Sequence, residues 1–120
     1  MHDRTMNQQS TMPAVMSPDQ IAALPKKQLG EAVGVDNVVL WTDGTSTTGV
    51  LSVRAGARLG EHTHRTHHHH MWVLDGAAVI ADQRVGAGSY VHVPPGIEHD
   101  IDATDTGGVT VYYSYALPGT

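Results

Sequence analysis

Short apolar runs, each closed by a turn residue, make up the chain from residue 33 onward. The runs are rich in Val, Leu, Tyr and Trp, and they stop at Gly, Pro or Asp, which is typical of short β-strands. We therefore expect strands at residues 38–41, 49–54, 59–64, 68–74, 77–81, 90–93, 98–103 and 109–116. Many short strands with no helix between them predict an all-β sandwich or barrel.

The N-terminal segment has a different pattern. Residues 1–16 are polar and show no hydrophobic period, so we expect them to form a flexible arm. Residues 17–20 read Ser-Pro-Asp-Gln, which offers an N-cap, a proline at the first helical position and a capping-box glutamine. A short helix should follow and end near Pro25, and residues 17–120 should form a single domain.

Composition narrows the functional classes. A chain of 120 residues with a net charge of -5 is large enough for one domain, and it lacks the basic patch that nucleic acids require. It contains no cysteine, which excludes disulfides, thiolate metal sites and cysteine nucleophiles. No apolar run reaches the roughly 20 residues of a membrane span, and residues 7–10 are polar where a secretory signal needs apolar residues. We expect a cytoplasmic protein with no nucleic-acid and no membrane partner.

Histidine is the informative residue type, because the chain has 9 and six of them fall between positions 62 and 70. His62 and His64 are two apart on an expected strand, so their rings share a face. The run of residues 67–70 enters the next strand and presents imidazoles alternately to both faces. His99 follows a Pro-Pro-Gly turn that can direct a later strand back to the same point. Three or four neutral imidazoles in one concavity suit a divalent first-row transition metal.

The spacing of these histidines resembles the two sequence motifs of the cupin superfamily. The first motif matches as Gly56, five residues, His62-Thr63-His64, four residues, His69, six residues and Gly76. The second matches as Gly88, five residues, Pro94-Pro95-Gly96, two residues, His99, three residues and Ala103. Two anchors depart from the family pattern, because His69 stands where cupins usually have Glu and Ala103 where they have Asn. The resemblance implies a cupin-type double-stranded β-helix (jelly-roll) barrel with a metal ion held by His62, His64, His69 and His99.

Strand alternation leaves alternatives for the site. His67 shares a face with His69 and is an alternative fourth ligand, and so is His68 if the preceding loop is one residue shorter. His68 and His70 are otherwise expected at the surface or at a subunit interface. His67 and Tyr113 are the candidate catalytic residues, although the tyrosines also suit the core of a chain without Phe. The expected pocket lining is Met71, Val73, His92, Ile101 and Tyr115, with His92 at the rim.

The four expected histidine ligands affect which reactions the metal ion could support. Four histidines leave the charge of a divalent ion uncompensated, which makes it a stronger Lewis acid and favours a small anionic or chelating organic ligand. We expect Fe²⁺ first, with Mn²⁺, Ni²⁺, Cu²⁺ or Zn²⁺ as alternatives. The resemblance to all-histidine cupins favours a dioxygenase-type oxidoreductase. A redox-neutral isomerase, cyclase or lyase and a non-catalytic small-molecule-binding cupin are the alternatives.

Two further expectations concern assembly and pH. Exposed apolar positions such as Trp72 and Leu74 predict a homodimer, because a small barrel usually covers such positions with a copy of itself. Protons should displace the metal from its imidazole ligands below roughly pH 6.

Overall fold

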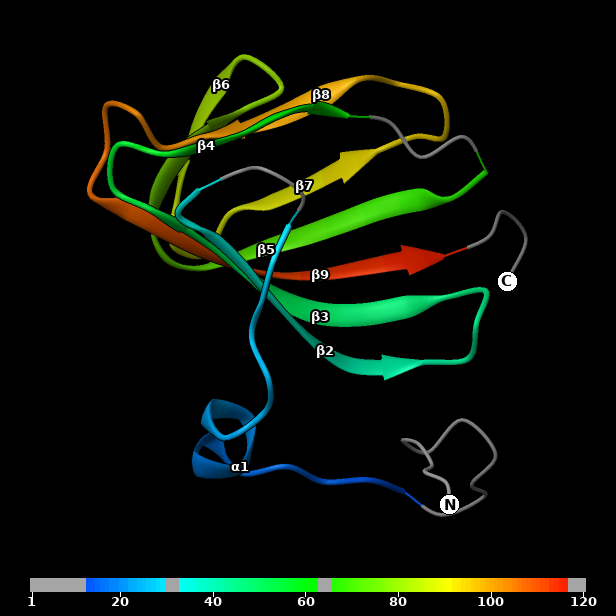
Figure 1. The fold of residues 1–120 in the computed structure, drawn as a ribbon. Helices are drawn as coiled ribbons and strands as arrows, with labels where there is room; N and C mark the ends of the chain where they lie inside the picture. Colours follow the sequence, from blue (N-terminus) through cyan, green and yellow to red (C-terminus); the bar gives the residue numbers. More distant parts are fainter. Residues whose placement is uncertain (1–12, 30–32, 63–65, 117–120) are drawn as a thin grey trace.

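The structure is a computed structural model that describes residues 13–29, 33–62 and 66–116, with only the backbone described at residues 61 and 62 (Figure 1). Most of the expected arm lies outside these residues, and so does His64. Within the described ranges the chain forms one short helix and nine strands.

The helix α1 (Pro18–Ala22) begins where the sequence predicts, so this prediction is confirmed. The Ser17 hydroxyl accepts the backbone N–H of Gln20 at 3.2 Å, and the Gln20 side chain accepts the N–H of Ser17 at 2.7 Å. This capping box satisfies two N–H groups that a helix leaves without an internal partner. No residue of α1 is buried, so the cap matters more to this helix than packing does.

The strands are β1 (Lys27–Gln28), β2 (Val35–Thr42), β3 (Thr47–Arg54), β4 (Arg58–His62), β5 (His68–Ile80), β6 (Gln83–Gly86), β7 (Tyr90–Val93), β8 (His99–Asp102) and β9 (Gly108–Ala116). The sequence pattern missed β1 and β6, because both are short and carry too few apolar residues to be recognised. It also divided β5 into two strands.

The division of β5 was wrong because Asp75-Gly76 forms a bulge and not a chain-reversing turn. The register of β5 against β9 shifts between Val73 and Asp75, and Gly76 has a φ of 79°. A β-bulge bends a strand without ending it. A Cβ atom on Gly76 would overlap the carbonyl oxygen of Gly108, so glycine allows the two strands to approach at the bend.

The strands form a curled antiparallel sheet in the order β1-β2-β3-β9-β5-β8-β4, with β6 and β7 also paired to β5 (Figure 1). The first half of β5 pairs with β7 and β9, and its last residues pair with β6 and β8. One long strand therefore belongs to both layers and closes the sheet toward a barrel. The all-β fold class with one short helix is confirmed.

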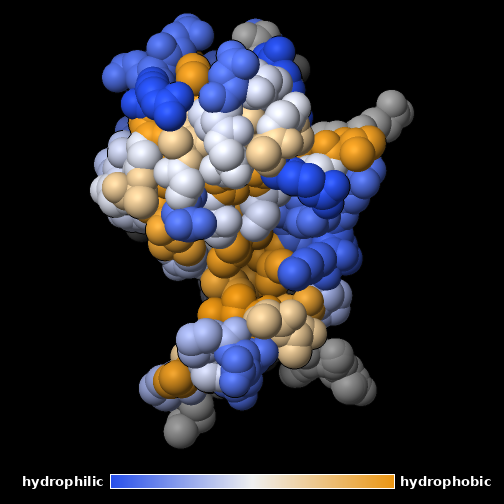
Figure 2. Space-filling model, turned by 90° about the vertical axis from the view of Figure 1, so that its left-hand side faces the viewer, coloured by the Kyte–Doolittle hydropathy of each residue, from blue (hydrophilic) through white to orange (hydrophobic). Residues whose placement is uncertain are grey.

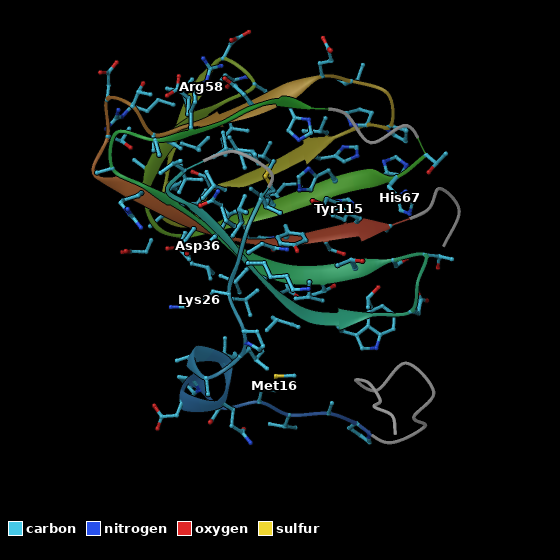
Figure 3. The ribbon with its side chains drawn as sticks, in the orientation of Figure 1. Met16, Lys26, Asp36, Arg58, His67 and Tyr115 are labelled. Atoms are coloured by element: carbon cyan, nitrogen blue, oxygen red, sulfur yellow. The ribbon has the colours of Figure 1, made fainter. Side chains whose placement is uncertain are left out.

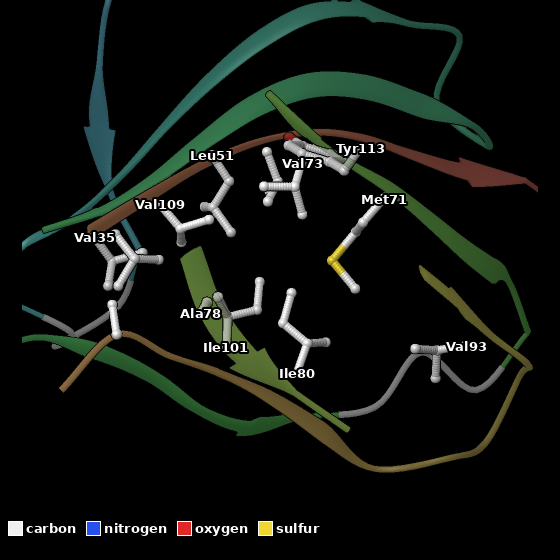
Figure 4. Packing of buried hydrophobic residues seen from close by; sticks show 13 residues of the cluster. Val35, Leu51, Met71, Val73, Ala78, Ile80, Val93, Ile101, Val109 and Tyr113 are labelled. Atoms are coloured by element: carbon white, nitrogen blue, oxygen red, sulfur yellow. The ribbon is translucent and has the colours of Figure 1, made fainter. Parts of the chain in front are cut away.

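The core fills the space between the two layers (Figure 4). Buried positions alternate along β3, β5 and β9, which is the pattern of strands with one face on a core. The largest fully buried side chains are Met71, Ile80, Ile101, Val35, Val53 and Val111. Tyr113 is 3% exposed and packs among them, so tyrosine does serve as core in this chain without Phe.

Hydrophobic side chains also gather between α1 and the barrel, where Figure 2 shows a continuous apolar band. A cavity of ≈ 380 Å³ lies there, and its lining includes Met16, Ile21, Leu40, Trp41 and Tyr112. No helix within the described ranges is long and apolar enough to cross a membrane.

Candidate metal centre

Two of the predicted ligands, His69 and His99, meet inside the barrel. His69 lies on β5 and is 2% exposed, and His99 lies on β8 and is 3% exposed. The His69 Nδ1 and the His99 Nε2 are 2.9 Å apart, and the ring centres are 5.0 Å apart. The two side chains therefore point their ring nitrogens at each other in a water-poor interior.

The orientation of His99 is set by the turn that precedes its strand. The His99 Nδ1 lies 3.3 Å from the carbonyl oxygen of Ile97. A neutral His99 that donates its Nδ1–H to this carbonyl presents a lone pair at Nε2, on the side of His69. A second hydrogen bond of this kind is what fixes most metal-binding histidines.

The distances between the two rings fit a shared metal ion. With metal–nitrogen bonds of about 2.0–2.1 Å, two imidazoles bound at 90–109° have ring centres about 4.5–5.2 Å apart. The observed 5.0 Å lies inside this range. Among the side chains that the structure describes, no group of three or more His, Asp or Glu converges, so the ligand set would have to be completed by residues outside that description.

His62 and His64 are the predicted residues that would complete it. The backbone of His62 ends β4 and lies in register with His99 on β8, whereas His64 lies outside the described residues. An ion pair of 2.7 Å between Arg58 and Asp100 joins the same two strands. The strand pairing thus places the His62 backbone beside His99, one member of the buried pair.

Two tyrosines on β9 border the buried pair. The Tyr115 ring centre is 4.6 Å from that of His69, and the Tyr113 ring centre is 6.1 Å from it. The Tyr113 hydroxyl donates to the Oδ1 of Asn37 at 2.6 Å. Burial raises the pKa of Tyr113, and the hydrogen bond to Asn37 opposes this shift only in part. The pKa of Tyr115 is also raised, mainly by burial and secondly by the nearby Tyr113. Both phenols stay protonated at neutral pH.

His67 does not lie beside His69 as strand alternation predicted. Strand β5 begins at His68, so the alternation does not reach residue 67. The His67 Nε2 contacts the backbone carbonyl of Thr45 in the β2–β3 turn, and its Nδ1 lies 2.9 Å from the Thr66 hydroxyl (Figure 3). The side chain of His67, the candidate base, therefore contacts the β2–β3 turn.

His68, His70 and His92 lie on the outer face of the sheet. The expectation that His68 and His70 point away from His69 matches the structure, since His69 is buried and both neighbours are half-exposed. His92 differs from its expected place at the pocket rim, because Val93 points inward on β7 and alternation turns His92 outward. Burial first, and then the charges of His92 and His68, lower the pKa of His70.

The remaining predicted pocket residues face the interior. Met71, Val73 and Ile101 are buried in the core (Figure 4). Tyr115 is partly buried and packs against this core. Ala103, at the position where cupins have Asn, is buried, and its backbone exchanges hydrogen bonds of 2.9 Å with Gly56 and Ala57. These hydrogen bonds join Ala103, at the end of the second motif, to Gly56, at the start of the first motif.

Asn37 is the functional neighbour that the sequence analysis missed. It lies on β2 and reaches Tyr113 across β3, where Gly49 has no side chain to fill the intervening space. The signal in the sequence is a polar residue within an apolar strand, which is too common to single out, and its register partner on β3 is Leu51.

Comparison with known proteins identifies the family to which this fold belongs. Residues 14–116 match the family described as the ChrR cupin-like domain. No curated protein sequence matches the chain.

Solved structures with the same fold include a predicted oxalate decarboxylase from Thermotoga maritima, with a TM-score of 0.71 and 15% identity over 81% of this chain and 96% of that one. The polyketide cyclase RemF from Streptomyces resistomycificus has a TM-score of 0.69 and 19% identity over 84% and 79%. The anti-sigma ChrR of Rhodobacter sphaeroides, solved in complex with SigE, has a TM-score of 0.66 and 20% identity over 90% and 71%. At these identities the structures establish the fold alone, and together with the family match they show that the chain belongs to the ChrR cupin-like family of the cupin superfamily.

Proposed function

We propose that this cupin domain holds one divalent transition-metal ion through His69, His99, His62 and His64, and binds a small anionic or chelating organic molecule beside it. The observation that supports this most directly is the buried contact between His69 and His99. Two buried imidazoles whose ring nitrogens are directed at each other suit a first-row transition metal. Fe²⁺ is the proposed ion, with Mn²⁺, Ni²⁺, Cu²⁺ and Zn²⁺ as alternatives.

The residues around the pair would prepare the site for such a ligand. A bound divalent ion supplies Lewis acidity toward an oxygen atom of the ligand. The Ile97 carbonyl holds the His99 ring, and the buried Met71 and Ile101 exclude water from the inner side. Exclusion of water strengthens the attraction between an anionic ligand and a cationic centre.

We propose a dioxygenase-type oxidoreductase as the reaction class. An isomerase, cyclase or lyase needs a general base beside the ligand. The two expected bases are occupied elsewhere, because His67 contacts Thr45 and the Tyr113 hydroxyl donates to Asn37 with a raised pKa. This arrangement favours a ligand that is already anionic when it binds.

Structural similarity supports two other candidates. The similarity to the cyclase RemF favours redox-neutral chemistry, and the similarity to the anti-sigma ChrR favours a non-catalytic ligand-binding role. A homodimer is part of the proposal in each case, with the exposed Trp72 and Leu74 in the contact.

The test begins with metal content. Untagged protein, purified without a metal-affinity column, is analysed for bound metals alongside His99→Gln and a His67→Ala control. We expect His99→Gln to contain about one metal ion per chain fewer than the wild type and His67→Ala, since each ligand contributes strongly to affinity. Equal metal content in His99→Gln and the wild type would contradict the site.

The reaction class is tested next with the Fe²⁺-loaded protein. Uptake of oxygen on addition of small enolates or catechols supports the oxygenase. Turnover of the same compounds without oxygen would instead indicate redox-neutral chemistry. Ligand-induced thermal stabilisation with no turnover in either atmosphere would indicate a binding protein.

A further inference from the structure

A second pair of histidines, His68 and His92, lies on the outer face of the sheet, whereas the pair His69 and His99 lies in the interior. The His68 Nδ1 and the His92 Nε2 are 2.7 Å apart, and the two ring centres are 5.0 Å apart. His68 precedes His69 on β5, so one ring faces solvent and the next faces the core. His92 comes from the neighbouring strand β7.

We propose that His68 and His92 form a second binding site for a divalent transition-metal ion, separate from the buried centre and open to solvent. The chemical class of the ion is the one that imidazole prefers, such as Zn²⁺, Ni²⁺ or Cu²⁺. This inference does not depend on the buried pair, because the two sites share no ligand.

The ring positions already suit chelation. Two imidazoles bound to one ion at 90–109°, with metal–nitrogen bonds of about 2.0–2.1 Å, have ring centres about 4.5–5.2 Å apart and nitrogens about 2.9–3.3 Å apart. The ring centres are in this range. The nitrogens need to separate by only a few tenths of an ångström, so an ion can bind between them once the ring that donates this hydrogen bond moves its proton to its other ring nitrogen.

The neighbouring residues hold the pair while leaving it accessible. His70 lies in register with His92, its ring centre is 5.0 Å from that of His92, and the interplanar angle is 15°. The His70 Nδ1 lies 2.6 Å from the Tyr90 hydroxyl, so Tyr90 fixes the stacked ring beside the site. His92 is exposed and His68 is half-buried, which leaves room for water molecules to complete the coordination shell.

The experiment is a Zn²⁺ titration of the untagged full chain by calorimetry at roughly pH 7.5, where histidine is mostly neutral. The variants are His92→Ala, and His67→Ala as a matched control. His92 is separated from His68 by 24 residues, so its removal leaves the run of four histidines intact. We expect His92→Ala to lose one equivalent of Zn²⁺ or to bind it at least about tenfold more weakly, as loss of even an outer partner does. His67→Ala should match the wild type.

A further variant separates this site from the buried one. His99→Gln should keep the equivalent that depends on His92, whether or not the buried pair binds metal. Circular dichroism of His92→Ala, whose side chain is exposed, checks that the fold is kept. The same stoichiometry and affinity in His92→Ala and the wild type would overturn the proposal, and so would an equal loss in His67→Ala, which would assign the binding to the histidine run itself.

Discussion

Tyr113 and His69 lie on neighbouring strands and share one interior, yet the chemistry of their polar atoms differs. The His69 Nδ1 is directed at another imidazole, whereas the Tyr113 hydroxyl donates to the amide oxygen of Asn37. A buried phenol with a raised pKa and an acceptor already in place is a structural group before it is a base.

The substitution Tyr113→Phe tests this assignment. It leaves the Asn37 oxygen without its donor in a partly buried position, so we expect a loss of about 1 kcal/mol in the free energy of unfolding, measured with urea. Metal content should not change. Tyr112→Phe, on the opposite face of β9, is the control and should unfold like the wild type. Loss of turnover with unchanged stability would instead make Tyr113 a catalytic residue.

Spacing in the sequence was enough to single out His69 and His99 but not to choose among the neighbours of His69. Alternation places His67 on the same face as His69, and a loop shorter by one residue would place His68 there instead, so both stay alternatives in the sequence. The structure begins β5 at His68 and places His67 against Thr45. A contact of this kind depends on the β2–β3 turn, which lies far away in the sequence, so local pattern could not reveal it.

At the scale of elements, the strands were predictable where apolar residues alternate, and they were not where the backbone bends. The pattern over residues 109–116 identified β9 almost to the residue. The sequence predicts a turn at Asp75-Gly76 because both residues favour turns. A bulge uses the same residue types, and only the pairing of β5 with β9 distinguishes the two.

Gly76→Ala should be strongly destabilising, whereas Gly88→Ala should not. Both glycines have a positive φ, 79° and 90°, so the left-handed backbone costs each variant about 1 kcal/mol. The added methyl overlaps the Gly108 carbonyl only at Gly76, because nothing lies within 4 Å of a Cβ at Gly88. That overlap should add about 1–3 kcal/mol, measured by urea unfolding. Equal losses in the two variants would show that the close approach at the bulge is unimportant.

The turn between β2 and β3 supplies a pH prediction. The Asp43 Oδ1 accepts hydrogen bonds from the backbone N–H groups of Thr45 at 2.8 Å and Ser46 at 2.7 Å. These hydrogen bonds lower the pKa of Asp43 from 3.8, and the bond from Ser46 has the largest effect. A carboxyl whose pKa is lower in the folded state stabilises the fold above its unfolded pKa, and this stability is lost as the pH falls through the folded value.

Comparison of Asp43→Asn with the wild type measures this effect. The asparagine keeps an oxygen for the turn but does not titrate, so urea unfolding should show a stability difference at neutral pH that shrinks as the pH falls below about 4. Asp43→Ala lacks the turn oxygen and should be less stable than Asp43→Asn at every pH. A difference between wild type and Asp43→Asn that stays constant down to pH of about 2 would contradict the assignment.

At the scale of the whole molecule, the outer face of the sheet carries exposed apolar side chains. Trp72 and Leu74 on β5 are 40% and 55% exposed, and the Trp72 ring packs on Tyr90 and Tyr112 with ring centres 5.2 and 5.6 Å away. Aromatic and aliphatic groups held in fixed positions on a sheet face are typical of protein contacts, so the contact of the proposed homodimer is expected on this face.

Leu74→Glu should shift the chain from dimer to monomer. In a twofold dimer both copies would place the new carboxylate in the contact, so we expect association at least about tenfold weaker, measured by sedimentation equilibrium with a chelator to exclude metal bridging. Ile97→Glu is the matched control, because Ile97 is 53% exposed but lies in the loop between β7 and β8. It should sediment as the wild type does. A monomeric wild type would contradict the homodimer, and a Leu74→Glu variant that remains fully dimeric would move the contact away from this face.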